Sequence, residues 1–277
     1  MRFSTSPGPI GIFDSGYGGL TILDAIRRLL PQYDYLYLGD NARAPYGPRS
    51  FDVVYEFTRQ AVEYLFNQGC QLVVLGCNTA SAKALRTIQQ HDLPQWDPER
   101  RVLGIIRPTA EVIGRLTVSR HVGVFATEGT IRSESYNMEI QKLHPDISVT
   151  GVACPFWVPL VEYNEADKPG ADYFVKKRID QLMALDPQID AVILGCTHYP
   201  LLMPKIQKYM PQGVRIVAQG EYVATSLQQY LHRHPEMELR CSRQGRTLYL
   251  TTENPDKFKE QAQLFLHEDV DVKNTVL

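Results

Sequence analysis

The sequence predicts an α/β protein built from two similar doubly wound domains whose sheets are mainly parallel. The first observation is a stretch that occurs twice, Leu-Val-Val-Leu-Gly-Cys-Asn-Thr-Ala-Ser over residues 72–81 and Ala-Val-Ile-Leu-Gly-Cys-Thr-His-Tyr-Pro over residues 191–200. A short aliphatic run that ends at a turn signal is typical of a strand buried on both faces of a parallel sheet. The second observation is the alternation of such runs with helix-like segments, which indicates sheets covered by helices on both faces.

The first part of the chain alternates strand and helix three times. Pro31 ends the first helix, Ser50 can cap the second, and Gly69 is well placed to end it. We expect strands over residues 9–14, 33–39 and 102–106 and in the first cysteine stretch, and helices over residues 20–30 and 79–90 and between Ser50 and Gly69. Residues 91–101 are read as a polar break.

The same alternation continues after residue 106. We expect strands over residues 121–126, 147–153 and 214–218 and in the second cysteine stretch, with helices over residues 132–143, 169–184 and 201–209. Residues 154–162 are read as an apolar loop that ends in an acid, Glu162. The tail is read as a helix over 222–231, a strand over 247–251 and a helix over 255–265 that return to the first domain.

The spacing of the two cysteine stretches predicts the domain boundaries. Cys77 and Cys196 lie 119 residues apart, which is about one medium domain. We therefore expect residues 1–106 with 218–277 to form the domain that carries Cys77, and residues 107–217 the domain that carries Cys196. In open parallel sheets, ligands bind just beyond the carboxyl ends of the strands. We predict one active site in the cleft between the two domains, approached by a thiol from each.

Composition and charge exclude several classes of protein. Of 277 residues, 44% are hydrophobic and 22% charged, and the net charge is −2 without any cluster of like charges, so nucleic acid is a poor guess for a partner. No apolar run approaches the roughly 18–20 residues that span a membrane, and the first nine residues lack the apolar core of a signal peptide. Five widely spaced cysteines without a C-x-x-C pair indicate neither a disulfide framework nor a zinc site. We expect a reduced cytoplasmic enzyme without a metal.

A glycine-rich turn, Ser15-Gly16-Tyr17-Gly18-Gly19, follows the first strand. Thr21 stands where a dinucleotide-binding fingerprint would have its third glycine, and no Walker lysine follows, so a nucleotide site is not favoured. The turn fits better with backbone amides that approach a small anionic group at the start of a helix. A turn that is merely tight is the plain alternative.

The residues gathered at the predicted strand ends indicate proton transfer. They are Asp14, Cys77, Glu162, Cys196 and His198. One cysteine with a histidine would suggest a nucleophile, but a second cysteine in the equivalent place fits the inversion of a stereocentre better. Inversion by proton transfer needs a base on one face of the carbon and an acid on the other. Thiols suit both roles, because a pKa near ~8.5 is readily tuned toward neutrality.

Five ordered motifs resemble the cofactor-independent glutamate racemase family, over about residues 9 to 265. The motifs are Phe-Asp-Ser-Gly-Tyr-Gly-Gly-Leu (13–20), Pro-Tyr-Gly-Pro (45–48), Gly-Cys-Asn-Thr-Ala-Ser (76–81), Pro-Leu-Val-Glu (159–162) and Gly-Cys-Thr-His-Tyr-Pro (195–200). The resemblance implies two α/β domains with the active site between them, interconversion of L- and D-glutamate without pyridoxal phosphate or another cofactor, and supply of D-glutamate for peptidoglycan. A homodimer is the expected assembly.

The resemblance also implies a role for each motif residue. Cys77 would take the α-proton from D-glutamate with help from Asp14, and Cys196 would take it from L-glutamate with help from His198, with Glu162 nearby. Family substrate-binding positions match Asp14, Ser15, Tyr46, Gly47, Asn78, Thr79, Thr197 and His198.

Three places depart from the commoner family pattern. They are Gln219-Gly220, Glu128 and Arg107-Pro108-Thr109. These differences bear on regulation and on the dimer interface and leave the chemistry alone.

Three other functions stay open at this point. An aspartate racemase would use the same two thiols, although relatives of that kind typically carry Glu where this chain has His198. A cysteine-dependent hydrolase would use Cys196 and His198 and would not need Cys77. A binding or regulatory protein that keeps the fold is the third, and the intact Cys77, Cys196, Asp14 and His198 speak against it.

Overall fold

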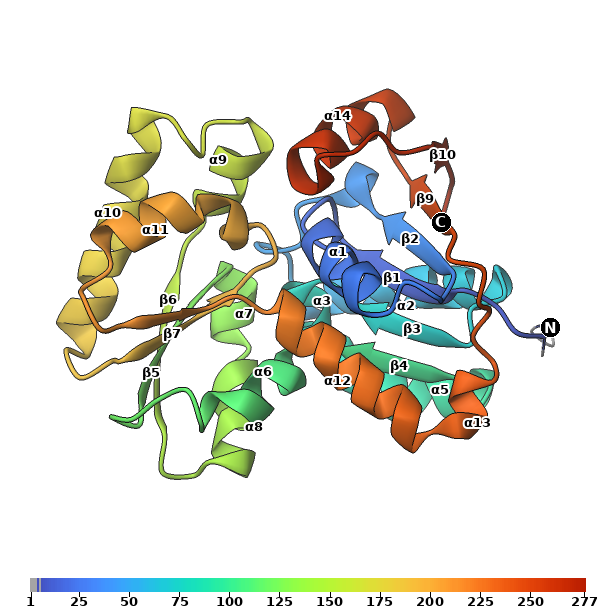
Figure 1. Ribbon diagram of the computed structural model, residues 1–277, viewed down its shortest axis with the longest axis horizontal. Coiled ribbons are helices and arrows are strands. Elements are labelled where there is room, and N and C mark those ends of the chain that lie inside the picture. Colours follow the sequence, from blue (N-terminus) through green and yellow to red (C-terminus); the bar gives the residue numbers. More distant parts are fainter. Residues whose placement is uncertain (1–3, 5) are drawn as a thin grey trace. The chain divides into compact units, whose positions relative to one another are not determined.

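The chain folds into two compact units, each with its own sheet. The computed structural model describes residue 4 and residues 6–277, so part of the segment inspected for a signal peptide lies outside the described residues. Unit 1 comprises Met1–Ile105 with Gly220–Leu277, and unit 2 comprises Ile106–Gln219 (Figure 1). The assignment of residues 1–106 with 218–277 and of residues 107–217 to two domains stays a prediction.

Within the described residues, unit 1 contains a parallel sheet of six strands in the order β10-β9-β2-β1-β3-β4. The strands are β1 (Ile10–Asp14), β2 (Tyr35–Gly39), β3 (Leu72–Leu75), β4 (Arg101–Gly104), β9 (Thr247–Thr251) and β10 (Val272–Asn274). Strand β9 pairs with β2 from Tyr35↔Thr247 to Gly39↔Thr251, so the end of the chain completes a sheet that its beginning started.

Helices cover both faces of this sheet. Helix α1 packs against α12 and α14, while α2 and α3 pack together on the other face (Figure 1). The helices of unit 1 are α1 (Leu20–Leu29), α2 (Phe51–Asn67), α3 (Asn78–Lys83), α4 (Leu85–Thr87), α5 (Leu93–Trp96), α12 (Gly220–Arg233), α13 (Pro235–Glu238) and α14 (Pro255–Leu266), with a 3-10 turn η1 (Asn41–Arg43) and a π-helical turn η2 (Ile88–Asp92).

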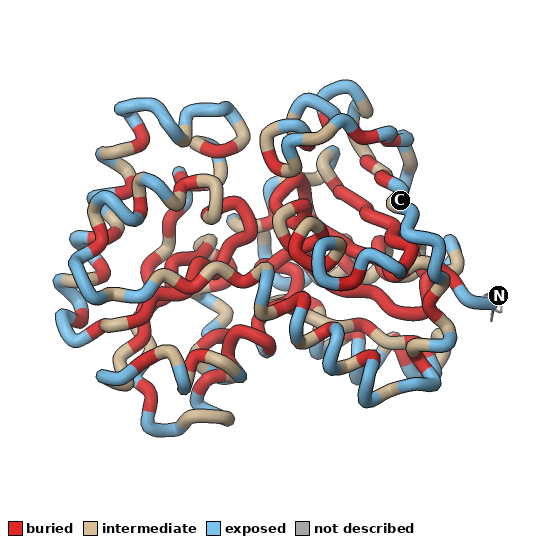
Figure 2. The backbone as a smooth tube through the Cα atoms, in the orientation of Figure 1, coloured by how far each residue is buried: buried red, intermediate tan, exposed pale blue. Residues whose placement is uncertain are grey.

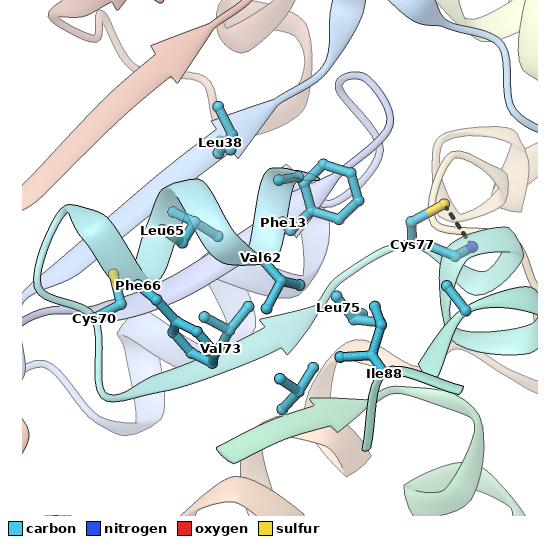
Figure 3. Packing of buried hydrophobic residues seen from close by; sticks show 14 of the residues in the cluster. Phe13, Leu38, Val62, Leu65, Phe66, Cys70, Val73, Leu75, Cys77 and Ile88 are labelled. Atoms are coloured by element: carbon cyan, nitrogen blue, oxygen red, sulfur yellow. Dashed lines mark hydrogen bonds between the residues drawn. The ribbon is translucent and has the colours of Figure 1, made fainter. Parts of the chain in front are cut away.

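The core between α2 and the sheet sets the position of the first cysteine stretch. Val62, Leu65 and Phe66 project from one side of α2 onto residues of β1 to β4, as Figure 3 shows. The i, i+3 and i+4 spacing of these residues places them on one helical face. Ser50 caps this helix by accepting a hydrogen bond from the Val53 N–H, as predicted.

Unit 2 contains a parallel sheet of four strands in the order β6-β5-β7-β8, counted over residues that are all described. Its strands are β5 (His121–Ala126), β6 (Ser148–Ala153), β7 (Ala191–Gly195) and β8 (Arg215–Val217). Helices α6 and α8 pack together, and so do α10 and α11 (Figure 1). The helices are α6 (Ile106–Ile113), α7 (Glu128–Arg132), α8 (Ser135–Leu143), α9 (Trp157–Glu162), α10 (Pro169–Leu185) and α11 (Met203–Tyr209), with a 3-10 turn η3 (Tyr199–Leu202).

The predicted α/β class with doubly wound parallel sheets is confirmed. In both units the central strands are buried along their length, whereas the outer sides of the helices are exposed (Figure 2). In the described part of the chain, none of the helices combines the length and the apolar character needed to cross a membrane.

Two local predictions are wrong. The helix expected over 79–90 is interrupted at Ala84 and continues, through α4 and η2, into the segment expected to be a polar break. The loop expected over 154–162 contains helix α9, which ends at Glu162. Trp157 begins that helix fully buried against the rings of Phe125 and Tyr199, so tertiary packing orders a segment whose sequence lacks helical periodicity.

Each sheet has one point where the order of strands reverses. In unit 1, β1 lies between β2 and β3, and in unit 2, β5 lies between β6 and β7. The strand that follows β1 in the chain lies on one side of it and β3 lies on the other side; the same holds for β6 and β7 around β5. The carboxyl ends of strands at such a point are the usual ligand site of an open parallel sheet. Cys77 follows β3 and Cys196 follows β7, so each thiol lies beside such a point.

The core of unit 1 gives a stability prediction. Replacing the fully buried Phe66 by Ala should lower the free energy of unfolding by about 3–5 kcal/mol, because the substitution removes apolar burial and leaves a cavity. Phe51 lies on the same helix but is 50% exposed, so Phe51→Ala is the matched control and should change stability by less than about 1 kcal/mol. Urea denaturation of both variants tests this. Equal effects would contradict the assigned core.

Candidate active site

We call Cys77 and its neighbours in unit 1 the Cys77 site. The thiol stands at the N-cap position of α3, where its sulfur accepts the Ala80 N–H at 3.5 Å (Figure 3). The Ser15 hydroxyl lies 3.4 Å from the same sulfur. Cys77 is 6% exposed, so both contacts form in surroundings that exclude most water. Asn78 and Thr79, the predicted substrate-binding residues that follow, form the buried first turn of this helix.

Asp14 ends β1, the strand next to β3, and is almost completely buried. Its Oδ1 accepts the Gly16 N–H at 2.8 Å, which holds the glycine-rich turn against the strand end. The Tyr37 hydroxyl donates to the Gly16 carbonyl at 2.9 Å. Burial raises the pKa of Tyr37, and the negative charges of Asp14 and Cys77 raise it further, so both groups act on one hydroxyl. The turn therefore brings the predicted pair Asp14 and Cys77 into one electrostatic environment.

The glycine-rich turn is required by close packing. A Cβ on Gly19 would lie 2.6 Å from the Asp14 Cβ, a separation that real Cβ atoms do not reach. Glycine at this position therefore lets the start of α1 approach the carboxylate-bearing strand end. This is a structural reason for the Gly-Gly pair that the sequence places before α1.

Tyr46, another predicted substrate-binding residue, uses its hydroxyl within the protein. It donates to Asp40 Oδ2, and burial together with the charge of Asp40 raises its pKa. Asp40 is fully buried and also accepts from Arg43 Nε at 2.6 Å and from Thr252 Oγ1 at 2.9 Å. These bonds hold the segment that contains Tyr46 and the partly exposed Gly47 at the carboxyl end of β2.

Asp40 is a site residue that the sequence reasoning did not single out. Its signal was its position directly after a predicted strand, where ligand-binding side chains commonly lie. In the structure the Asp40 carboxylate instead holds its own loop.

We call Cys196 and its neighbours in unit 2 the Cys196 site. The sulfur lies 3.8 Å from His198 Nδ1, and His198 Nε2 lies 2.8 Å from Glu162 Oε1. Cys196, Thr197 and His198 are buried in the turn after β7, whereas Glu162 at the end of α9 is 29% exposed. The structure thus brings three predicted catalytic residues into one hydrogen-bonded chain. Glu162 was the member with the weakest sequence support, and helix α9 is what places it.

The charge state of His198 follows from this chain. Burial favours the neutral imidazole, but the hydrogen bonds to Cys196 and Glu162 and the negative charges of both outweigh burial and raise the pKa of His198 to about 10. The ring is therefore an imidazolium at neutral pH. Both of its nitrogens then carry hydrogen, so one donates to the Cys196 sulfur and the other to the carboxylate.

The remaining cysteines have different surroundings. Cys70, Cys154 and Cys241 are buried, and burial raises the pKa of each thiol, in Cys241 to about 12. The Cys154 thiol follows β6 and donates to the Val152 carbonyl at 3.6 Å. Among the residues that the structure describes, no group of three or more His, Cys, Asp and Glu side chains is arranged to hold a metal ion.

Comparisons with known proteins identify the family of the chain. A sequence model described as Asp/Glu/Hydantoin racemase matches residues 19–227. The chain belongs to this racemase family. It is accordingly an amino-acid racemase, an enzyme of the isomerase class.

Individual relatives agree over nearly their whole length. A glutamate racemase from Ruegeria sp. (strain TM1040) is 40% identical over 271 residues, which cover 94% of this chain and 97% of that protein. The crystal structure of a glutamate racemase isoform from Bacillus anthracis has a TM-score of 0.89 at 33% identity and covers 98% of both chains. That of a glutamate racemase from Francisella tularensis in complex with D-glutamate has a TM-score of 0.86 at 29% identity, with 98% and 97% covered.

The close approach at Gly19 gives a prediction about activity. Gly19→Ala should lower the kcat/KM of this racemase at least about tenfold, because the new methyl group must displace Asp14 or the start of α1. Gly170→Ala is the control, since a Cβ there meets nothing within 4 Å. A Gly19→Ala protein with the activity of Gly170→Ala would show that the position of Asp14 does not matter.

The raised pKa of His198 gives a prediction about stability and pH. The ordinary pKa is 6.5 and the folded value about 10, so the proton stabilises the fold fully below pH 6.5, and this stabilisation is lost as pH rises to 10. The loss of stability caused by His198→Gln, measured by urea denaturation, should therefore be larger at pH 6.5 than at pH 10. His234→Gln changes a histidine that is 44% exposed and serves as the control. An effect of His198→Gln that does not vary with pH would refute the imidazolium.

Proposed function

We propose that this racemase interconverts L- and D-glutamate by moving the α-proton between Cys77 and Cys196, without a cofactor. The observation that carries the proposal is the equivalence of the two thiols. Each is buried, and each follows a strand at the point where its sheet reverses order. The names of the relatives and the D-glutamate bound in the Francisella structure support glutamate as the substrate.

The chemistry needs one thiolate and one thiol at a time. The thiolate removes the proton from the α-carbon, and the thiol on the opposite face returns a proton to the resulting carbanion, so the configuration inverts. After turnover the thiolate and the thiol have exchanged roles, which suits an enzyme that works in both directions. Positioned acid–base groups contribute about 10²–10⁴-fold each, and exclusion of water adds to this.

In the Cys196 site the His198 imidazolium donates to the sulfur, and Glu162 holds that imidazolium. We assign to Cys196 the removal of the proton from L-glutamate. Cys77 has the Ser15 hydroxyl and the Ala80 N–H as neutral partners. We assign to it the removal of the proton from D-glutamate, with Asp14 assisting. The two thiols are therefore tuned by different means.

Polar groups around the thiols would hold the substrate. Ser15, Asn78, Thr79 and Thr197 flank the two cysteines in sequence or by hydrogen bond. The Tyr46 hydroxyl donates to Asp40 but still has a lone pair, which can accept a hydrogen bond from the substrate ammonium group. We also assign Asp14, Gly47 and His198 to the residues that bind the substrate.

The proposal extends to the setting of the enzyme. We propose a cytoplasmic protein, a homodimer, that supplies D-glutamate for peptidoglycan and has neither nucleic acid nor membrane among its partners. The net charge of −2 supports the exclusion of nucleic acid, and the five cysteines, every one of them described, form no disulfide.

A second candidate function rests on the Cys196–His198–Glu162 chain. A thiol, an imidazole and a carboxylate in this order are also the parts of a cysteine nucleophile that forms an acyl-enzyme. Such a hydrolase would not require Cys77. Aspartate in place of glutamate is the other alternative, and it keeps both thiols.

Isotope exchange in D₂O distinguishes these functions. The wild-type protein, without added pyridoxal phosphate, should racemise L-glutamate and place deuterium on the α-carbon. Cys77→Ser and Cys196→Ser should each lower racemisation by at least about 10³-fold, because a serine hydroxyl is far less acidic than a thiol. Cys154→Ser is the matched control, since it replaces a buried strand-end thiol whose hydrogen bond to Val152 a hydroxyl can keep. Optical rotation and α-deuterium content are the measurements.

Each alternative has its own outcome. α-Deuterium exchange that survives Cys77→Ser but not Cys196→Ser would show that the Cys196–His198–Glu162 chain works without Cys77, as the hydrolase alternative requires. Exchange with aspartate but not with glutamate would replace the substrate and keep the mechanism. Absence of rotation change and exchange with both amino acids would refute the proposed racemisation.

A further inference from the structure

The segment that ends unit 2 carries a buried amide with two hydroxyl partners, one on α6 and one on α8. Gln219 Nε2 donates to Thr109 Oγ1 at 3.1 Å and to the Tyr136 hydroxyl at 2.8 Å. Gln219 is 2% exposed, and Thr109 and Tyr136 are also buried. The –NH₂ group has two hydrogens, and these two bonds use both. Gln219 and Thr109 lie in two segments that were expected, from the sequence, to depart from the commoner family pattern and to leave the chemistry alone. For Gln219 we infer otherwise.

Tyr136 connects this amide to the second cysteine stretch. A Cβ on Gly195, the residue before Cys196, would lie 3.0 Å from Tyr136 Cε2, so the tyrosine ring rests on the backbone that ends β7. The charge of Cys196 also acts on the Tyr136 hydroxyl. The position of the Tyr136 ring therefore affects the position of the turn that carries the Cys196 thiol. The Gln219 amide holds the ring in place through the hydrogen bond to the Tyr136 hydroxyl.

We propose that Gln219 is a positioning residue for Cys196, acting through the ring of Tyr136. This inference rests on the proposed two-thiol racemisation and adds a residue that neither the motifs nor the Cys196–His198–Glu162 chain includes. A neutral amide suits the place because a carboxylate there would add negative charge near a thiolate and disfavour it.

Gln219→Leu tests the assignment, since leucine fills a similar volume without donating. Misplacement of a reacting group by about 1 Å costs on the order of 10²-fold, so we expect kcat/KM to fall between about tenfold and about a hundredfold. Enantiomers have equal free energies, so the equilibrium constant is one and kcat/KM must fall equally in both directions. Equal falls therefore do not identify the thiol, and a second readout is required.

Isotope effects with α-deuterated substrates identify the affected step. If transfers at Cys196 are impaired, removal of deuterium from L-glutamate by Cys196 becomes more fully rate-limiting, and the isotope effect on kcat/KM rises in that direction. In the reaction of D-glutamate, Cys77 removes the deuterium before the slow protonation by Cys196. Removal then becomes reversible, and the isotope effect on kcat/KM falls in that direction. The ratio of the L to the D isotope effect should thus increase in Gln219→Leu, which a mere loss of folded protein cannot cause.

Gln71→Leu is the matched control. Gln71 is as buried as Gln219 and also makes two hydrogen bonds through its Nε2, to the Ser4 and Ser6 carbonyls at 2.8 and 3.0 Å, but it precedes β3 in unit 1. It should leave the isotope-effect ratio at the wild-type value. A change in kcat/KM of less than about twofold in Gln219→Leu, or a larger fall with an unchanged ratio, would overturn the proposal.

Tyr136→Phe is the second variant, in case Gln219→Leu does not fold. It keeps the ring against Gly195 and removes only the hydroxyl, so the isotope-effect ratio should move in the same direction. In the double variant the loss of kcat/KM should be smaller than the product of the single losses, because both changes break one connection. Independent losses would overturn the route through Tyr136. A wild-type protein that does not racemise glutamate would instead overturn the proposed function, and this assignment with it.

Discussion

Strands β1, β3 and β7 are buried along their whole length, and this burial determines where polar chemistry can occur in the chain. A charged or reactive side chain within such a strand would be desolvated without a partner, at a cost of several kcal/mol. At the strand end, the pairing of the sheet stops, and the first turn of the next helix offers N–H groups. Asp14, Cys77 and Cys196 all occupy this place. The apolar strands are thus what restricts the reactive groups to one edge of each sheet.

The glycines before the two thiols show how tightly that edge is packed. A Cβ on Gly76 would lie 3.3 Å from the Phe13 carbonyl oxygen, and a Cβ on Gly195 would lie 3.1 Å from the Phe125 carbonyl oxygen. Both carbonyl groups belong to the neighbouring strand, so the repeated Gly-Cys pair meets the same kind of neighbour in both units. Gly195 differs in that the Tyr136 ring also lies against it. The thiols differ as well, since the Ser15 hydroxyl and the Ala80 N–H contact Cys77 and an imidazolium contacts Cys196.

The strands, the main helices and the residues beside each thiol could be predicted because local signals determine them. Strands 121–126 and 247–251 have the predicted bounds, and the Ser50 cap is where its hydroxyl suggested. Helix α9 could not be predicted, because the segment has no helical periodicity. The packing of Trp157 against the rings of Phe125 and Tyr199 orders it. The partners of Gln219 could not be predicted for a similar reason. A hydrogen bond between residues 83 or 110 positions apart leaves no mark in the local sequence.

The sheet of unit 1 has a consequence for synthesis of the chain. Strand β2 pairs with β9, whose residues follow about two hundred positions later and only after the whole of unit 2. At roughly 5–20 residues per second, a ribosome needs on the order of 10–40 s to deliver that partner. During this interval one edge of β2 lacks its neighbour, and an open strand edge is a template for pairing with other chains. The nascent protein is therefore exposed to aggregation from the time that β2 is synthesised until β9 is synthesised.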